Sequence, residues 1–122
     1  MTNRPPSQNH RPVYRIDKFK VPSAARNEFL ERAREIQSFL STLPGFVEDA
    51  IYEQLGGPGA FNFVTLVAWE SAEAAEAAKN AVSARFEAKG FNPQQFRARL
   101  GIEADAALYQ QIPPRDEIGG SK

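Results

Sequence analysis

The stretch Phe61-Asn-Phe-Val-Thr-Leu-Val-Ala-Trp69 decides the fold of this chain. Its β-branched and aromatic residues favour an extended strand. Side chains alternate along a strand, so the odd-numbered residues share one face and the even-numbered residues share the other. Both faces are largely apolar, and we therefore expect both to be covered. A layer of helices covers only one face, which points to a second sheet against the other.

Three further strands are predicted from two-residue alternation of apolar and polar side chains, at Val13–Val21, Phe46–Leu55 and Ala106–Ile112. Between the second of these and the stretch quoted above lies Gly56-Gly57-Pro58-Gly59, which predicts a tight reversal and hence a hairpin. This glycine run lacks the Lys-Ser/Thr pair of phosphate-binding loops and the spacing of dinucleotide-binding loops.

Helical periodicity predicts three helices. The first is expected between Ser23, which we expect to cap it, and Pro44-Gly45. An alanine-rich segment between Ser71 and Gly90 predicts the second, because alanine is the best helix former. A short third helix is expected between Asn92-Pro93 and Gly101.

The order of these elements predicts an α+β fold, a ferredoxin-like βαββαβ unit with an extra short helix before the last strand. Its sheet is antiparallel and carries the helices on one face. The uncovered face predicts a homodimer in which two sheets pack together about a two-fold axis. The alternative is a monomer with an exposed apolar face.

The folded unit is expected to span residues 13–112, with flexible tails at residues 1–12 and 113–122, which are polar and rich in proline and glycine. The N-terminal residues have no apolar signal region, and no run reaches the roughly 20 apolar residues of a membrane helix. We therefore expect a cytoplasmic protein.

Composition excludes several classes of function. The chain has 15 Lys and Arg against 15 Asp and Glu, so it lacks the basic excess that drives binding to nucleic acids or anionic membranes. It has no Cys and one His, His10. We therefore expect no metal site, because Cys and His supply most transition-metal ligands.

Leu43-Pro44-Gly45-Phe46, the hairpin, and Val64-Thr-Leu-Val-Ala-Trp-Glu-Ser71 before an alanine-rich helix resemble the antibiotic biosynthesis monooxygenase family. The resemblance covers roughly Tyr14 to Ile112. It implies a dimeric α/β barrel. The family includes oxygenases that oxidise polycyclic phenols without metal or flavin, haem-degrading monooxygenases, and members with no known reaction.

The haem-degrading members carry an Asn on the first strand, a Trp at the end of the third strand and an iron-ligating His on the second main helix. Trp69 matches the Trp, and the Asn position falls on Asp17. Residues 71–89 contain no His, so the iron has no evident axial ligand. The resemblance therefore disfavours haem degradation.

The resemblance leaves oxidation of a phenol without a cofactor, and it therefore implies no cofactor for this chain. Such a reaction needs a base, a group that stabilises an anion, and an apolar pocket. We assign Asp17 and Trp69 as catalytic candidates, with Asp17 as the base. Arg15 is expected to hold an anionic oxygen of a small aromatic ligand. Further substrate-binding candidates are Tyr52, Phe29, Phe63 and Phe86.

Each of these residues also has a structural interpretation. Trp69 and the Phe residues can simply fill the core, and Arg15 and Asp17 can pair with each other on one strand face. Tyr52 can equally cap an edge of the dimer. The second function class is accordingly a non-catalytic dimer that binds a small ligand or serves in stress response or assembly.

Overall fold

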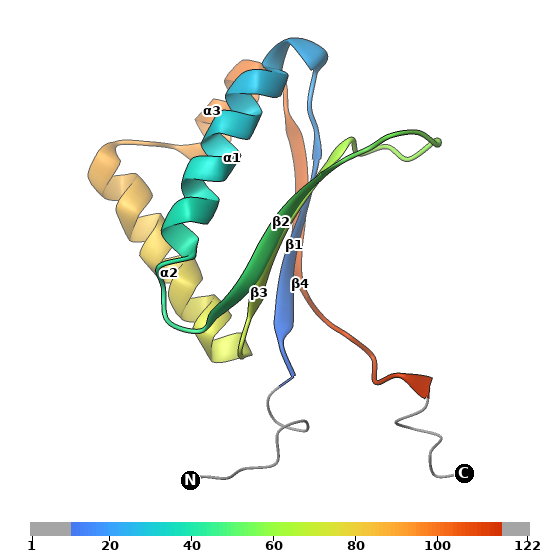
Figure 1. Cartoon of the computed structure of the whole chain (residues 1–122). Helices are drawn as coiled ribbons and strands as arrows, with labels where there is room; N and C mark the ends of the chain where they lie inside the picture. Colours follow the sequence, from blue (N-terminus) through green and yellow to red (C-terminus); the bar gives the residue numbers. More distant parts are fainter. Residues whose placement is uncertain (1–10, 116–122) are drawn as a thin grey trace, which may run out of the picture.

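Four antiparallel strands and three α-helices form the part of the chain that the computed structural model describes, residues 11–115. The helices lie together on one side of the sheet (Figure 1). The strands are β1 (Val13–Lys20), β2 (Phe46–Glu53), β3 (Phe63–Trp69) and β4 (Glu103–Gln110). The helices are α1 (Arg26–Leu40), α2 (Ala72–Lys89) and α3 (Pro93–Leu100). This is the expected α+β ferredoxin-like fold with an extra short helix.

The sheet has the order β2-β3-β1-β4, so β3 and β1 are its central strands. Val13 lies opposite Trp69, Arg15 opposite Val67 and Asp17 opposite Thr65. The odd-numbered residues of both central strands therefore share one face. Because Phe63, Val67 and Trp69 are buried beneath the helices, we call this the helix-covered face.

Two apolar clusters make up the core between the sheet and the helices. One surrounds Phe29 of α1 and Phe63 of β3, whose ring centroids lie 5.1 Å apart. The other surrounds Trp69 and includes Val13, Val67 and Ala78 of α2. Between them, the positions of Arg15 and Asp17 interrupt the apolar surface of β1.

The predicted helix ends are confirmed at α2 and α3. The hydroxyl oxygen of Ser71 accepts a hydrogen bond from the Ala74 amide at 3.1 Å, and Gly90 ends α2 in the left-handed conformation with φ 67°. Asn92 caps α3, and Gly101 ends it at φ 73°. These residues supply what helix ends require, namely an acceptor for a free amide at the start and a left-handed position at the end.

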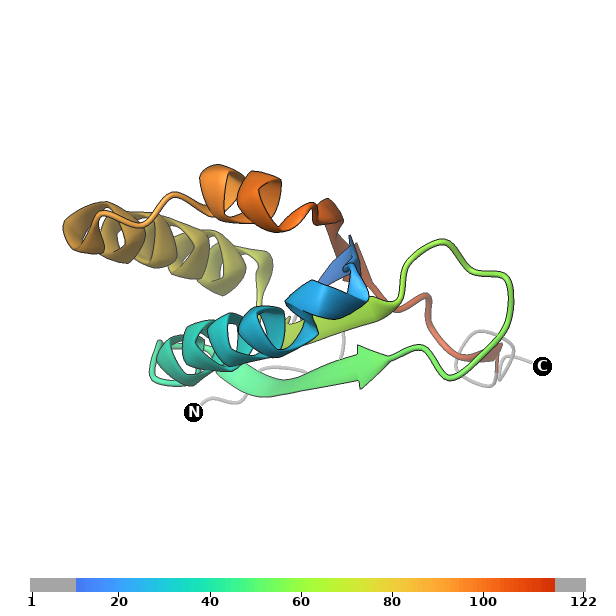
Figure 2. The same ribbon diagram turned by 90° about the horizontal axis from the view of Figure 1, so that it is seen from above.

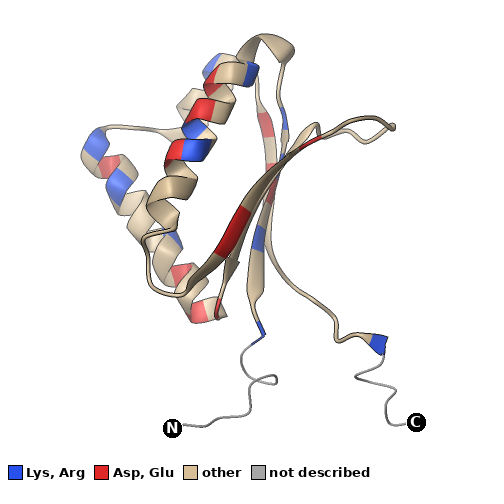
Figure 3. Cartoon of the chain, viewed as in Figure 1, with Lys and Arg blue, Asp and Glu red and all other residues tan. Residues whose placement is uncertain are grey.

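The expected cap at Ser23 is wrong. Ser23 begins a 3₁₀ turn, Ser23–Ala25, and α1 starts only at Arg26 without a side-chain cap. Charged residues of both signs are distributed along α1 (Figure 3).

Strand boundaries also differ from the prediction. The strand before Trp69 starts at Phe63, although the Asn62 backbone still donates to the Phe19 carbonyl at 2.9 Å and accepts from the Gln54 N–H at 2.8 Å. The Asn62 side-chain amide bonds to Val21, donating to its carbonyl at 2.9 Å and accepting from its N–H at 2.8 Å. β4 spans Glu103–Gln110, not 106–112, and pairs with β1 from Lys20 opposite Glu103. Every residue of this edge strand is exposed, so apolar content does not mark where it begins.

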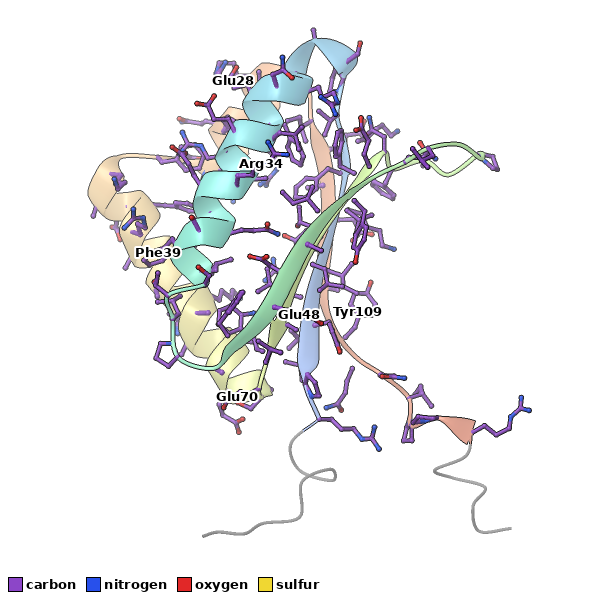
Figure 4. The ribbon with its side chains drawn as sticks, in the orientation of Figure 1. Glu28, Arg34, Phe39, Glu48, Glu70 and Tyr109 are labelled. Atoms are coloured by element: carbon purple, nitrogen blue, oxygen red, sulfur yellow. The ribbon has the colours of Figure 1, made fainter. Side chains whose placement is uncertain are left out.

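The other side of the sheet, formed by the even-numbered residues of β1 and β3, has no covering element within residues 11–115. We call it the open face. Two exposed tyrosines belong to the open face, Tyr109 (43% exposed) and Tyr52 (55% exposed). Figure 4 shows Tyr109 on the side away from the helices. Half-buried Ile16 and Leu66 lie opposite each other at its centre.

The segment between β2 and β3 extends beyond the strands it joins (Figure 2). Leu55 at its base is fully exposed, and the glycine run follows it. None of the helices within residues 11–115 is both long and apolar enough to cross a membrane. The expected tails fall almost entirely outside the described residues, as does His10.

Candidate functional site

Arg15 and Asp17 form an ion pair on the helix-covered face of β1. The Arg15 Nε donates a hydrogen bond to the Asp17 Oδ1 at 2.8 Å. Two-residue periodicity places both side chains on the same face, and the flanking strands present Thr65 and Val67 on one side and Ala106 and Leu108 on the other. The Arg15 side chain is nevertheless 40% exposed and that of Asp17 25% exposed. Solvent therefore reaches a charged pair that lies on the side of the sheet that the helices cover.

Partial burial perturbs Asp17. Desolvation raises the pKa of its carboxyl above the ordinary value, and this outweighs the opposing effects of Arg15, through charge and hydrogen bond, and of the more distant charge of Arg97. A carboxylate with a raised pKa is a better proton acceptor than an ordinary surface carboxylate.

Arg97 on α3 is a member of this site that the sequence analysis missed. It is half-buried, and its guanidinium forms no hydrogen bond or ion pair with any residue from 11 to 115, although its charge acts on Asp17. The position falls in the last turn of a short helix, where a basic residue is expected for the helix dipole alone. No local signal relates it to β1, because Asp17 and Arg97 are 80 positions apart in the sequence.

Trp69 lies next to the pair but inside an apolar cluster. It is 2% exposed and contacts the Phe46 ring edge-on at 5.9 Å between centroids. Its indole N–H donates no hydrogen bond to any described residue. Trp69 lies opposite Val13, two positions along β1 from Arg15.

The remaining predicted residues are placed differently. Phe29 and Phe63 pack together in the cluster on the other side of the pair. Phe86, near the end of α2, contacts Phe91 at 5.0 Å. Tyr52 lies on the open face, opposite Val64, and so on the other side of the sheet from Asp17. Within one chain, Arg15 and Asp17 are paired. Trp69 lies on the same face but four positions along β3 from Thr65, the partner of Asp17, and Tyr52 lies on the opposite face.

Two hollows of the described surface lie elsewhere. One, of about 620 Å³, runs along α1 between Arg26 and Ser38, and the other, of about 230 Å³, lies between Leu43–Gly45 and the alanines of α2. Neither is lined by the Arg15–Asp17 pair. The ion pair is the better candidate for a functional site, because a charged pair on the covered side of a sheet is less common than a shallow surface hollow. No cluster of three metal-ligating side chains occurs within residues 11–115.

Known proteins share sequence features with this chain. The sequence profile of the antibiotic biosynthesis monooxygenase family matches residues 12–89. No curated protein sequence is similar enough to this chain to count as a match.

Solved structures share the fold at low sequence identity. SnoaB, a cofactor-independent oxygenase from Streptomyces nogalater, is 16% identical with a TM-score of 0.60, covering 86% of this chain and 97% of its own. The haem-degrading protein MhuD from Mycobacterium tuberculosis, with two haems in its active site, is 21% identical with a TM-score of 0.63. The match covers 84% of this chain and 97% of MhuD. A dimeric ferredoxin-like protein from an uncultured marine organism is 7% identical with a TM-score of 0.63 (86% and 98%).

Proposed function

Because this chain belongs to the antibiotic biosynthesis monooxygenase family, we propose that it is a cofactor-independent monooxygenase acting on a small aromatic or polyketide-like phenol. The observation that supports this best is the Arg15–Asp17 pair. It combines a base of raised pKa with an adjacent cation, on the covered side of the sheet and within reach of solvent.

Each charge has a role in the proposed reaction. The Asp17 carboxylate accepts the phenol proton, and the Arg15 guanidinium stabilises the phenolate that results. The electron-rich phenolate then supplies electrons to O₂. Overall, the ring carbon para to the phenol oxygen becomes a carbonyl that takes one oxygen atom of O₂, and the other oxygen atom leaves as water with the hydrogen of that carbon and the phenol proton. The substrate thus provides all four electrons.

Trp69 has a positioning role in this proposal. It is 2% exposed and packs with Val13 and Val67, the neighbours of Arg15 along β1 and across on β3. Its bulk fixes the part of the sheet that carries the pair. Phe29 and Phe63 have the same positioning role at the other end of the pair, in the cluster that also contains Phe19 of β1.

Haem degradation is the other activity among the structural neighbours, and the residues of this chain do not fit it. α2 contains no His, and no His occurs within residues 11–115. Alanines occupy most of the inner face of α2, including buried Ala78. These methyl groups cannot ligate iron.

We also propose that the functional unit is a homodimer formed through the open face. Apolar and aromatic side chains are exposed there, including Tyr52 and Tyr109, and monomeric proteins rarely leave such a face uncovered. A two-fold axis lets the same patch cover itself. The similar fold of a protein described as dimeric supports this arrangement.

Neighbouring residues of β4 give a matched test of the dimer. Tyr109 is 43% exposed on the open face, and Leu108 is 48% exposed on the helix-covered face. Tyr109→Lys is expected to weaken association in sedimentation experiments at micromolar concentration, whereas Leu108→Lys leaves the mass unchanged. A wild-type mass of one chain would refute the dimer.

Oxygen uptake tests the proposed activity. A panel of naphthols, quinols and anthrone-type phenols is incubated with the protein, and ¹⁸O incorporation from ¹⁸O₂ is measured by mass spectrometry. Asp17→Asn is expected to lower kcat by about 100-fold or more, the typical contribution of general acid–base catalysis. Asp49→Asn provides the control. Asp49 lies on the edge strand β2, on the same helix-covered face of the sheet as Asp17; its carboxylate is exposed and forms no ion pair within residues 11–115. Equal turnover by the two variants would contradict the assignment of Asp17.

The packed surroundings of Trp69 favour a second function, a non-catalytic dimer that binds a small ligand. A 2% exposed indole in an apolar cluster leaves little enclosed volume beside it. Saturable binding of an aromatic compound without any ¹⁸O incorporation would support this function over the oxygenase.

A further inference from the structure

The charges around Asp17 do not balance. Arg15 and Arg97 contribute two positive charges and Asp17 one negative charge. The carboxylates that β2 places on this face, Asp49 and Glu53, are two strand spacings or about 10 Å from β1, and Glu53 is already paired with an arginine of α1. This part of the helix-covered face therefore carries an excess positive charge, although the whole chain has a net charge of zero.

The donors of both arginines are largely unused. Arg15 donates only its Nε hydrogen to Asp17, and its two terminal amino groups bond to no described residue. The Arg97 guanidinium forms no hydrogen bond within residues 11–115. A guanidinium presents five N–H donors in a planar fork that matches a carboxylate.

The helix dipole does not account for Arg97. A cation in the last turn of α3 would suffice for the dipole, and Arg99 already provides one at the surface, where it pairs with Glu28 at 2.6 Å. Arg97 is instead half-buried, and its neighbour Phe96 packs against the same core cluster as Phe19, which lies two positions from Asp17 on the same face of β1. From there its charge acts on Asp17. Holding an unpaired guanidinium partly away from water has a cost that a bound anion would offset.

We propose that Arg97 and the terminal amino groups of Arg15 form an anion subsite, and that the aromatic ligand of this protein carries a carboxylate. This inference rests on the proposed function for the aromatic part of the ligand. The carboxylate is held by the two arginines, and the phenol hydroxyl is directed to Asp17. The subsite selects aromatic acids over neutral compounds of the same shape.

Binding measurements test the subsite without requiring turnover. The probes are 1-hydroxy-2-naphthoate and 1-hydroxy-2-naphthamide, which have the same size and differ by one charge. Titration calorimetry is expected to show about tenfold tighter binding of the carboxylate, the lower end of the range for hydrogen bonds to charged groups. Arg97→Gln is expected to remove most of this preference while leaving carboxamide binding within twofold.

Arg34→Gln is the matched control. It removes the same unit of charge from an exposed position on α1 (Figure 4) and is expected to leave both affinities unchanged. Circular dichroism verifies that each variant folds.

Three results would overturn the inference: equal binding of the two probes, no binding of either at millimolar concentration, or a carboxylate preference that survives Arg97→Gln. Each is distinguishable from failure of the proposed function. ¹⁸O incorporation into neutral phenols can persist without an anion subsite, and carboxylate selectivity can persist without any oxygenation.

Discussion

Gly45 allows the start of β2 to approach α2 closely, and replacing it with alanine tests that packing. Its φ is +85°, in the left-handed region that residues with a Cβ disfavour. A Cβ built at this position would lie 2.5 Å from the Cβ of Ala74 on α2. Its carbonyl also accepts a hydrogen bond from the Glu70 amide at 2.8 Å, directly after Trp69. The loop, the end of β3 and the start of α2 are thus fitted together at one point.

The magnitude follows from two separable contributions. The left-handed conformation costs a non-glycine residue about 1–2 kcal/mol. Carbon atoms pack at about 3.5–4.0 Å, so the two methyl groups must separate by roughly 1 Å, and overpacking of this kind costs about 1–3 kcal/mol. Gly45→Ala is therefore expected to lower the free energy of unfolding by about 3 kcal/mol, a large share of the 5–15 kcal/mol typical of a domain.

Urea denaturation at a fixed protein concentration measures this loss. With an m-value of about 1.5 kcal/mol/M, the midpoint falls by about 2 M. Gly57→Ala is the control, because Gly57 has φ +91° but no atom lies within 4 Å of the point that its new Cβ would occupy. It bears the conformational cost alone, and its midpoint is expected to fall by about 1 M or less.

A double variant separates the clash from the strain. In an Ala74→Gly background the methyl group that Gly45→Ala would meet is absent. The additional cost of Gly45→Ala is then expected to fall to that of Gly57→Ala. If Gly45→Ala and Gly57→Ala lower the midpoint equally in the wild-type background, the argument for close packing at Gly45 is refuted.

Three further predictions concern the site and the helix beside it. Folding raises the pKa of Asp17 above its ordinary value of 3.8, so the folded state binds more protons than the unfolded state. The free energy of unfolding therefore decreases as the pH rises from about 3.8 through the raised pKa. Denaturation of the wild type and of Asp17→Asn across this pH range is expected to show the decrease in the wild type only. Ser71→Ala removes the α2 cap and is expected to cost about 1 kcal/mol in urea denaturation, against less than about 0.5 kcal/mol for Ser83→Ala on the exposed side of the same helix. Haemin is expected to give no sharp, stoichiometric Soret shift, because α2 has no His, and a saturable shift at one haem per chain would contradict the rejection of haem.

Local chemistry explains which parts of the fold could be predicted from the sequence. The ends of α2 and α3 are set by single residues with specific side-chain or backbone properties, and those predictions are confirmed. The boundaries of β4 and the start of β3 are set by their pairing with β1, in which Lys20 lies opposite Glu103 and Phe19 opposite Phe63. Such long-range contacts leave no periodic signal in the residues themselves, so these boundaries were misplaced.

The same distinction applies to the candidate site. The relation between Arg15 and Asp17 was predictable because two-residue spacing on one strand places both on the same face. Arg97 was not, since only the packing of α3 brings it near β1. The placement of Tyr52 on the open face depends on the register of β2 against β3, which contains a bulge between Phe46 and Glu48. A bulge changes which residues share a face and is hard to read from alternation alone.

The chain has a net charge of zero, but the charges around its candidate site are unequal. Elsewhere on the described surface, ion pairs cancel charge locally, as between Arg26 and Glu53 at 2.7 Å and between Arg99 and Glu28 at 2.6 Å. These exposed pairs link α1 to β2 and to α3. At Asp17 the charges of two arginines act on one carboxylate, so cancellation is incomplete where the side chains are partly shielded from solvent. Electrostatic interactions strengthen as water is excluded, so an excess charge at this position attracts an anion more strongly than the same excess would on the outer surface of α1.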